Sequence, residues 1–281
     1  GPGRQGREDM SKNFTDLRDN LTMLTDFYEL TMANGYLANG YADTICYFDM
    51  FFRKVPDNGG FAIMAGVEQL VDYLKNLRFT EEDLEYLRSK HIFQEEFLDY
   101  LRHFTFACDV WAVPEGTPIF PGEPIVTVRG PAIQAQFIET MVLLCINHQS
   151  LIATKTARIV HAAQGDGIME FGLRRAQGPD AGIYGARAAM IAGCIGTSNV
   201  LAGQMFDVPV KGTHAHSWIM SFPDELTAFR TYAKLYPDAC ILLVDTYDTL
   251  GSGVPNAIRV FKEMREAGIP LTFYGIRLDS G

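Results

Sequence analysis

Cysteine is scarce in this sequence, and the few cysteines form no recognisable pattern. There are five of them, an odd number, and no Cys-x-x-Cys or Cys-x-His spacing occurs. This excludes a small scaffold held together by disulfides. Three of the five, Cys46, Cys145 and Cys240, lie inside apolar runs. We therefore interpret them as reduced core residues of an intracellular protein and expect a cytoplasmic location.

A basic excess and a long hydrophobic run are also missing. The 24 basic residues are outnumbered by 34 acidic ones, for a net charge of -10. Nucleic-acid partners are not expected, because binding phosphates along a strand needs a basic surface, although a local basic pocket for a small anion stays open. The longest apolar region, Met141–Ile152, is interrupted by Asn147, His148 and Gln149, so we expect no membrane span.

The first nine residues contain no apolar segment of the kind found in signal peptides. We interpret residues 1–9 as an expression-vector remnant, with the native start at Met10.

Hydrophobic residues, in contrast, are plentiful. They make up 47% of the 281 residues, and aromatic residues make up 12%. This composition excludes disordered and collagen-like chains and allows one large domain or two ordinary ones.

The first half of the chain has an irregular mixture of patterns. Apolar spacing predicts a helix over Asn20–Tyr36. Ile45–Arg53 is rich in strand-forming residues, and a turn cluster separates it from Phe61–Met64. This arrangement predicts a β-hairpin with a long loop. Further helices are expected from Val67 and after the capping box that begins at Thr80.

Proline-rich short strands over Phe106–Gly130 predict edge strands and turns rather than a central parallel sheet. The apolar stretch Ala132–Ala163 then predicts one or two connecting helices. We accordingly expect an N-terminal α/β domain, rich in β-strands, over residues 10–131 and connecting helices over 132–163.

From Ile168 onward, strands and helices alternate regularly. The expected strands are Ile168–Phe171, Cys194–Thr197, Pro209–Thr213, Cys240–Asp245 and Leu271–Ile276. Such alternation is typical of an α/β barrel or a doubly wound sheet. Because five strands cannot close a barrel, we favour an irregular TIM-like α/β barrel of which residues 164–281 are the first part.

Polar side chains follow each expected strand, where α/β proteins place their sites. Two arginines, two histidines and three aspartates come at these positions: Arg174, Arg175, His214, His216, Asp245, Asp248 and Asp279. Such a collection suits an anionic, phosphorylated substrate with Mg²⁺.

Each of these residues also has an ordinary structural explanation. Arg174 and Arg175 could pair with surface acids, and Asp245 and Asp248 could cap local structure. His214 or His216 could be a loop histidine without a role, although both could turn inward in a loop.

Two further residues also have both a functional and an ordinary structural explanation. Arg277 could form a surface ion pair with Asp279, and Phe171 could be a core residue. No Walker A, Gly-x-Gly-x-x-Gly or Gly-x-Ser-x-Gly motif is present to decide between these explanations. Asp245–Thr249 matches the diphosphoribose-binding signature of type I phosphoribosyltransferases only loosely.

Several segments, taken together in order and spacing, carry a specific resemblance. They are Leu24–Met32, Phe51–Arg53, Gly59–Ala62, Pro114–Gly116, Phe171–Asp180, Gly212–Ser217, Asp245–Asp248 and Arg277–Gly281. In these segments the chain resembles the nicotinate phosphoribosyltransferases, type II phosphoribosyltransferases of NAD salvage. The resemblance covers essentially all of Leu21–Gly281.

The resemblance implies an ATP-coupled, ligase-like transferase. Nicotinate and phosphoribosyl pyrophosphate would give nicotinate mononucleotide and pyrophosphate, with ATP hydrolysis coupled through a phosphohistidine at His216. It also implies ATP and Mg²⁺ as cofactors and a homodimer with shared active sites, in which Tyr28 of one subunit reaches the pyridine ring bound by the other.

The remaining roles are likewise what the resemblance implies. His216, Asp245 and Asp279 would be catalytic. Nicotinate would be bound by Tyr28, Phe171, Ser198 and Arg277, and phosphate by Arg174, Thr213 and Ser217. Asp245 and Asp248 would hold Mg²⁺ through phosphoribosyl pyrophosphate. Ser198 favours nicotinate over nicotinamide, because nicotinamide-using relatives carry an aspartate there, which would repel the nicotinate carboxylate.

Family members extend well beyond the end of this sequence, with further barrel strands and glycine-rich loops. We therefore expect this chain to be inactive alone, or to be accompanied by a second chain that carries the remainder.

Two other functions stay open. One is a metal-dependent barrel hydrolase that uses His214 and His216 as ligands. The other is a non-catalytic protein on the same scaffold that binds nicotinate or a phosphosugar.

Overall fold

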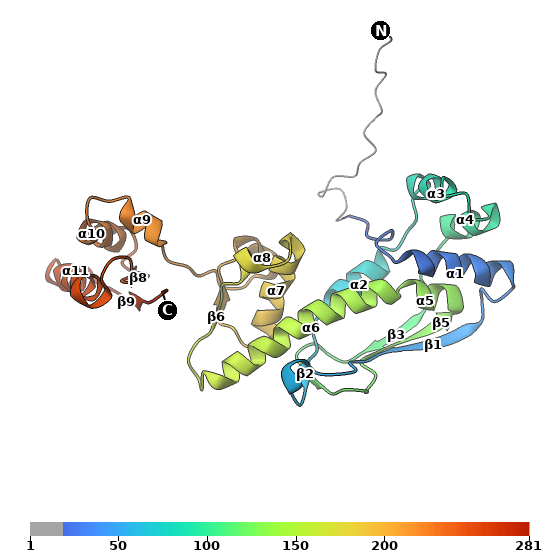
Figure 1. Ribbon diagram of the computed structural model, residues 1–281, viewed down its shortest axis with the longest axis horizontal. Helices are drawn as coiled ribbons and strands as arrows, with labels where there is room; N and C mark the ends of the chain where they lie inside the picture. The colour runs from blue at the N-terminus through green and yellow to red at the C-terminus, as the bar shows by residue number, and fades with distance from the viewer. Residues whose placement is uncertain (1–18, 281) are drawn as a thin grey trace, which may run out of the picture. The chain divides into compact units, whose positions relative to one another are not determined.

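The computed structural model describes residues 19–280, which divide into two compact units (Figure 1). Unit 1 ends at Val210 and unit 2 begins at Lys211. This division falls inside the predicted barrel segment 164–281, and the predicted domain limits themselves stay predictions. The predicted vector remnant, residues 1–9, and the final Gly281 lie outside the described residues.

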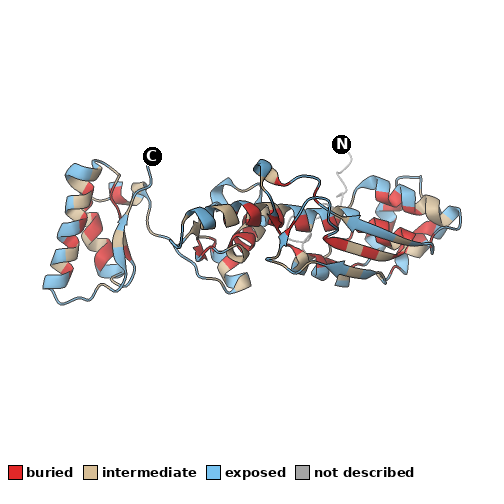
Figure 2. Ribbon diagram, turned by 90° about the horizontal axis from the view of Figure 1, so that it is seen from below, coloured by how far each residue is buried: buried red, intermediate tan, exposed pale blue. Residues whose placement is uncertain are grey.

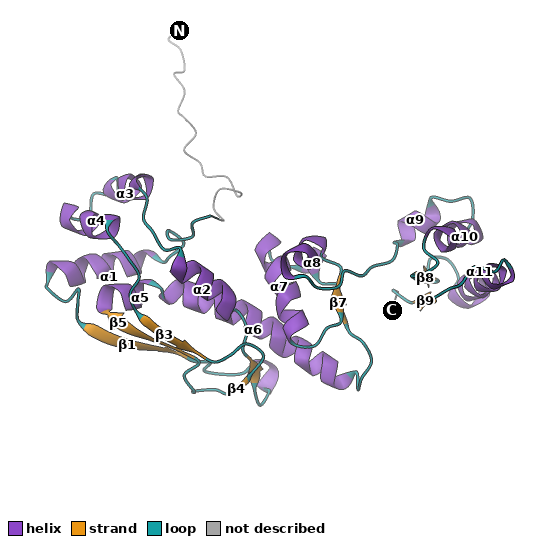
Figure 3. Cartoon of the chain, turned by 180° about the vertical axis from the view of Figure 1, so that it is seen from behind, coloured by secondary structure: helices purple, strands orange, loops and turns teal. Residues whose placement is uncertain are grey.

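A three-stranded antiparallel sheet forms one layer of unit 1 (Figure 3). Its order is β1 (Ile45–Met50), β5 (Val126–Pro131) and β3 (Asp109–Ala112). Along β5, Val126 and Val128 are buried, whereas Thr127 and Arg129 on the other face are partly exposed. This alternation is what a sheet with one covered face requires, and α5 (Ala132–Phe137) and α1 (Phe27–Ala38) pack on the covered side.

The predicted hairpin between Ile45–Arg53 and Phe61–Met64 is wrong. β1 pairs with β5, and β2 (Ala62–Ile63) pairs instead with β4 (Pro118–Ile119). The backbone N–H groups of Ile63 and Ala65 donate to side-chain hydroxyls of Thr154 and Ser150 on α6 (Glu139–Ala162). Contacts with a helix distant in sequence therefore hold this segment away from β1.

The predicted first helix begins later than expected. Residues 20–26 form turns, and α1 starts at Phe27. Asn20 Oδ1 accepts a hydrogen bond from Thr22 N, and Thr22 Oγ1 accepts one from Arg78 N. These polar side chains form hydrogen bonds with backbone groups outside any helix and so compete with helix formation. The spacing of apolar residues does not reveal this competition.

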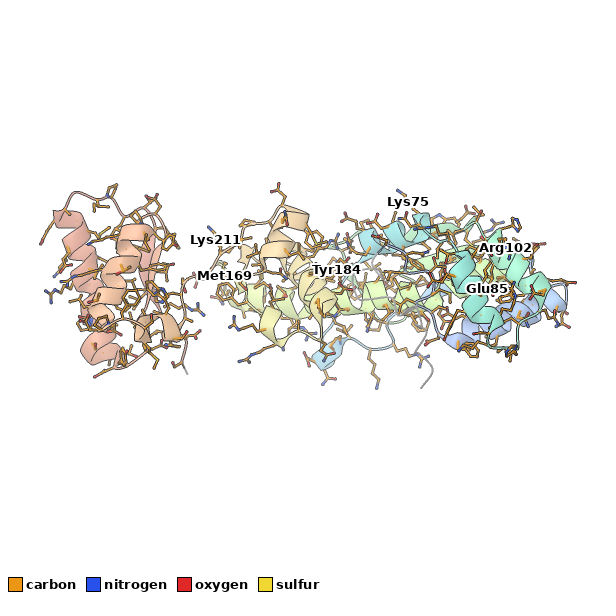
Figure 4. The ribbon with its side chains drawn as sticks, turned by 90° about the horizontal axis from the view of Figure 1, so that it is seen from above. Lys75, Glu85, Arg102, Met169, Tyr184 and Lys211 are labelled. Atoms are coloured by element: carbon orange, nitrogen blue, oxygen red, sulfur yellow. The ribbon has the colours of Figure 1, made fainter. Side chains whose placement is uncertain are left out.

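The capping box at Thr80 is confirmed. Thr80 Oγ1 accepts from Asp83 N at 3.2 Å, and Asp83 Oδ2 accepts from Thr80 N at 2.9 Å. It starts α3 (Glu81–Arg88), which follows α2 (Val67–Lys75) and precedes α4 (Glu95–Arg102). Arg102 forms an ion pair with Glu81 across the outer surface of α3 and α4, where Arg102 and Glu85 are labelled in Figure 4.

Two helices occupy Ala132–Ala163, as predicted: the short α5 and the long α6. By length and composition this stretch could cross a membrane, yet half of its most apolar window is buried inside the protein. Buried Gln149, Ser150 and Thr154 on α6 all form hydrogen bonds to other parts of unit 1 or to the helix itself. In the structure α6 is therefore a core helix of unit 1.

The last part of unit 1 contains the first parallel strands. β6 (Met169–Glu170) pairs with β7 (Gly196–Thr197), and α7 (Pro179–Ile191) and α8 (Val200–Phe206) follow them. A short 3₁₀ helix, η3 (Leu173–Arg175), lies between β6 and α7. The predicted strand Pro209–Thr213 is reduced to one parallel bridge between Thr197 and Val210, because β7 itself is only two residues long.

Unit 2 is a small α/β layer with its own buried interior (Figure 2). Its parallel strands are β8 (Cys240–Leu243) and β9 (Tyr274–Arg277), and α9 (His216–Met220), α10 (Glu225–Leu235) and α11 (Val254–Glu266) pack with them. A π-helical turn, η4 (Thr249–Gly253), precedes α11. The predicted α/β class is confirmed, whereas α9 and η4 were not foreseen.

Candidate functional site

Asp245 lies just beyond the end of β8, where the preceding Val244 is fully buried. Its side chain is 6% exposed, and its Oδ2 accepts hydrogen bonds from the backbone N–H groups of Asp279 and Ser280, both at 2.6 Å. The loop after β9 thus closes around the carboxylate at the end of β8. Adjacent parallel strands end at the same edge of the sheet. Asp279 and Ser280 therefore meet Asp245 there, although they lie 34 and 35 positions later in the sequence.

The pKa of Asp245 is lowered. Burial by itself raises the pKa of a carboxyl group, but the backbone N–H donors of Ser280 and Asp279 outweigh it by stabilising the charged form. The other oxygen, Oδ1, is buried and has no hydrogen-bond partner within the described residues. Asp245 therefore offers an ionised carboxylate with one oxygen free to interact.

His216 is the first residue of α9 and lies between two carboxylates. Its Nε2 is 3.7 Å from Asp245 Oδ1 and 3.6 Å from Asp279 Oδ2. Its Nδ1 is 3.0 Å from the hydroxyl oxygen of Thr246. The structure thus brings together the three residues expected to be catalytic: His216, Asp245 and Asp279.

This arrangement can prepare the imidazole for reaction. If Nδ1 carries the proton and donates it to Thr246 Oγ1, Nε2 keeps its lone pair and is a nucleophile. The adjacent carboxylates then stabilise positive charge that develops on the ring. Thr246 was not singled out from the sequence, and its position directly after Asp245 was the available signal.

Arg277 extends the same cluster. Its guanidinium donates to Thr213 Oγ1 at 3.0 Å and to Asp279 Oδ1 at 2.7 Å. The predicted nicotinate-binding Arg277 and the predicted phosphate-binding Thr213 are therefore neighbours. Ser217, the other predicted phosphate-binding residue of unit 2, is exposed at the second position of α9.

Asp248 has a capping role in the structure. Its Oδ1 accepts from Gly251 N at 2.9 Å, and its backbone carbonyl accepts from the N–H groups of Ser252 and Gly253. One of its oxygens is thus committed to the π-helical turn. Asp245 fits the coordination of Mg²⁺ better, because a carboxylate oxygen without a partner is a suitable ligand for a hard cation.

The His214 side chain has partners other than those of His216. Its ring packs against Trp218 and Tyr232, with centroids 5.3 and 4.7 Å away. Burial lowers its pKa and so favours the neutral form. Within residues 19–280, no cluster of three or more histidine, cysteine, aspartate or glutamate side chains is arranged to hold a metal. The geometry gives the two-histidine metal hydrolase no support.

A second group of predicted residues gathers at the ends of β6 and β7 in unit 1. Ser198 N donates to the backbone carbonyl of Glu170 at 3.0 Å. The Glu170 carboxylate accepts from Thr197 Oγ1 at 2.6 Å and from Gly172 N at 2.7 Å. Glu170, which sequence reasoning missed, therefore joins the loop that contains Phe171 to the turn that contains Ser198.

The other two predicted residues of unit 1 lie on its surface. Arg174 is exposed on η3, three residues after Phe171. Tyr28 is 43% exposed and is the second residue of α1, a helix that lies apart from β6 within unit 1 (Figure 1). A hydrogen bond to the Glu139 carboxylate, together with burial, raises the pKa of Tyr28. Tyr28 and Phe171 of one chain are thus not brought together within unit 1.

Comparison with known protein families matches nearly the whole described chain. Residues 23–147 match the nicotinate phosphoribosyltransferase (NAPRTase) N-terminal domain, and residues 167–281 match the nicotinate phosphoribosyltransferase (NAPRTase) family.

Curated relatives include the nicotinate phosphoribosyltransferase of Bacillus subtilis, 47% identical over 94% of this chain and 53% of the relative. Another is nicotinate phosphoribosyltransferase pncB2 of Mycobacterium tuberculosis, 46% identical over 92% of this chain and 55% of the relative. The chain spans about half the length of these relatives.

Among solved structures, human nicotinic acid phosphoribosyltransferase is similar, with a TM-score of 0.83 and 35% identity over 92% of this chain and 61% of that one. Nicotinate-nucleotide pyrophosphorylase from Pyrococcus furiosus has a TM-score of 0.70 at 22% identity, over 98% of this chain and 69% of that one, which shows a shared fold.

Proposed function

The chain belongs to the nicotinate phosphoribosyltransferase family, and from this premise we propose that it contributes to forming nicotinate mononucleotide and pyrophosphate from nicotinate and phosphoribosyl pyrophosphate. This is a step of NAD formation from nicotinate. The single observation that supports the proposal most strongly is the position of His216 between Asp245 and Asp279. A histidine between two carboxylates is suited to group transfer and has no evident use in a protein that only binds.

In this proposal His216 receives a phosphoryl group from ATP. Nε2 attacks the terminal phosphorus, the bond to the leaving ADP breaks, and the ring proton stays on Nδ1 against Thr246. Asp245 and Asp279 stabilise the charge on the ring. Coupling to ATP supplies free energy that favours the nucleotide product.

The substrate contacts follow from the chemistry of each side chain. Arg277 pairs with the nicotinate carboxylate, Ser198 donates a hydrogen bond to it, and Phe171 stacks on the pyridine ring. Arg174, Thr213 and Ser217 bind phosphate. Asp245 and Asp248 would hold Mg²⁺ together with phosphoribosyl pyrophosphate, and the ion would supply positive charge to neutralise the leaving pyrophosphate.

Tyr28 supports a homodimer with shared sites. It is exposed on α1, and α1 lies apart from β6, the strand that directly precedes Phe171 (Figure 1). A second copy would bring another Tyr28 to the open face of the bound pyridine ring, so that two aromatic side chains enclose it.

The proposed phosphohistidine is tested by measuring the intact mass of the protein before and after incubation with Mg-ATP. We expect a gain of about 80 Da, one phosphoryl group, that is stable to base and lost in acid. His216→Ala should abolish the gain, whereas His103→Ala, which changes an exposed histidine on the surface of unit 1, should leave it intact. A gain that survives His216→Ala would refute the assignment.

A further inference from the structure

Arg187 is a buried charge of unit 1 that forms four hydrogen bonds with side chains. It lies on α7 with only 8% of its surface exposed. Its two terminal nitrogens meet both oxygens of Glu115, at 2.8 and 2.6 Å. They also donate to Gln149 Oε1 at 2.8 Å and to Glu68 Oε2 at 2.7 Å. A planar guanidinium held by four hydrogen bonds has a fixed orientation as well as a fixed position.

The partners of Arg187 come from three other elements. Glu68 lies on α2, Gln149 on α6, and Glu115 on the loop between β3 and β4. Glu115 Oε1 also accepts the backbone N–H groups of Gly66 and Val67, at 2.5 and 3.1 Å, where α2 begins. Arg187 therefore attaches α7 to elements of the first family domain through Glu115 and Glu68.

The other end of α7 supports the predicted substrate-binding loops. A Cβ atom on Gly182 would lie 2.5 Å from Leu173 Cδ1, so the η3 turn that carries Arg174 packs directly on the α7 backbone. The Gly182 carbonyl also accepts from Asn199 Nδ2 at 3.2 Å, and Asn199 follows Ser198. A displacement of α7 would thus move both loops.

We propose that Arg187 is a positioning residue, which through α7 sets the places of the Phe171–Arg175 loop and Ser198 and so determines the affinity for nicotinate and phosphoribosyl pyrophosphate. This inference rests on the proposed function. All four hydrogen bonds from the Arg187 terminal nitrogens go to side chains of the protein, so in this proposal Arg187 holds α7 and does not bind substrate. Small displacements of binding groups have large effects on reaction geometry. Loss of the Arg187 contacts is therefore expected to weaken substrate binding, even though these contacts are distant from the reacting atoms.

The first test replaces Arg187 by lysine, which keeps the charge and loses the two-pronged contact with Glu115. We expect the KM values for both substrates to rise at least about tenfold, with kcat changed less than about threefold. The matched control is Arg230→Lys, because Arg230 also makes a two-pronged contact with a carboxylate, through Nε and one terminal nitrogen to Glu263, on the surface of unit 2. It should leave both constants unchanged. Unchanged KM values in Arg187→Lys would overturn the proposal.

A second variant separates positioning from stability. Arg187→Met leaves the partly buried Glu115 without its cation, which lowers Tm. Adding Glu115→Gln removes that unpaired charge while keeping an acceptor for Gly66 and Val67. We expect Tm to recover in the double variant and KM to stay raised. Recovery of KM together with Tm would show a purely structural role.

Hydrogen–deuterium exchange gives a readout that needs no activity. In Arg187→Lys, amides of residues 171–175 and 197–199 should exchange at least about threefold faster than in Arg230→Lys. If the exchange changes and the wild-type protein forms no product even together with the chain that carries the remainder of the barrel, the proposed function fails and the positioning role stands. Equal exchange in the two variants would refute the positioning role regardless of activity.

Discussion

Glu29 is a carboxyl group enclosed by neutral partners. It is fully buried, and its Oε1 accepts from Thr140 N at 3.0 Å and Thr140 Oγ1 at 2.5 Å, while Thr25 donates to its other oxygen. Burial raises its pKa above the ordinary value of 4.5, despite the opposing hydrogen bonds from Thr140 and Thr25. The folded state therefore binds a proton more tightly than the unfolded chain does.

The sign of the pH dependence follows from this raised pKa. Between the ordinary and the raised value the folded state holds more protons, so the free energy of unfolding falls as pH rises through that window. Glu29→Gln should remove this fall and stabilise the protein at neutral pH. Urea unfolding from about pH 4 to about pH 8 measures it, with the exposed Glu82→Gln as control. A wild-type stability that rises through the window would contradict the assignment.

Ser198 carries the expected preference for nicotinate. A carboxylate at this position would repel the nicotinate carboxylate and accept a hydrogen bond from the amide of nicotinamide. For Ser198→Asp we expect kcat/KM for nicotinate to fall by about tenfold or more, with a smaller change for nicotinamide.

Steady-state rates on both bases, in wild type and variant, measure this preference. Ser198→Ala serves as the control, because it removes the hydroxyl without adding charge. Equal efficiency of the wild-type protein on the two bases would refute the preference.

At the scale of elements, the π-helical turn η4 shapes the loop that follows β8. Gly253 at its end lies so close to Val244 that a Cβ would meet the Val244 carbonyl oxygen at 1.8 Å. Val244 directly precedes Asp245, so the turn packs behind a predicted catalytic residue. π-Helical turns are rare and occur frequently at functional sites.

Gly253→Ala should therefore destabilise unit 2 by about 3 kcal/mol, because a rigid backbone atom rather than a flexible side chain blocks the new methyl group. Activity should fall as well, since Asp245 would shift. Gly212→Ala, where no atom lies within 4 Å of the added Cβ, is the control from the same unit. Chemical denaturation compares them, and similar stability losses in both variants would argue against the packing explanation.

At the scale of the whole molecule, the two units have separate interiors. One core cluster extends from Leu30 to Ile146 and another from Ile219 to Met264. Lys211, at the start of unit 2, is exposed and lies outside any helix or strand (Figure 4). Exposed segments of this kind are preferred sites of proteolysis.

Within residues 19–280, limited trypsin digestion should therefore cut first after Lys211 and produce a fragment that begins at Gly212. Mass spectrometry of early time points identifies it, and Lys211→Gln should suppress it. Initial cleavage at the exposed Arg174 or Arg175 instead would show that the loop after β6 is the more accessible segment.

The sequence by itself determined those features that depend on neighbouring residues. The capping box at Thr80 consists of local hydrogen bonds, so the helix that it begins was predictable. The all-apolar strand before Asp245 likewise placed this acid at a strand end. Family resemblance then assigned roles to His216, Asp245 and Asp279 before any distance was known.

Only the tertiary structure decided which distant groups meet. β1 pairs with β5 rather than β2, because hydroxyl groups on α6 bind the backbone around β2. His214 and His216 are two residues apart, yet one packs among aromatic rings while the other faces two carboxylates. Arg187 finds Glu115 across 72 positions of the chain. These outcomes depend on packing and burial summed over the whole fold, which no local pattern encodes.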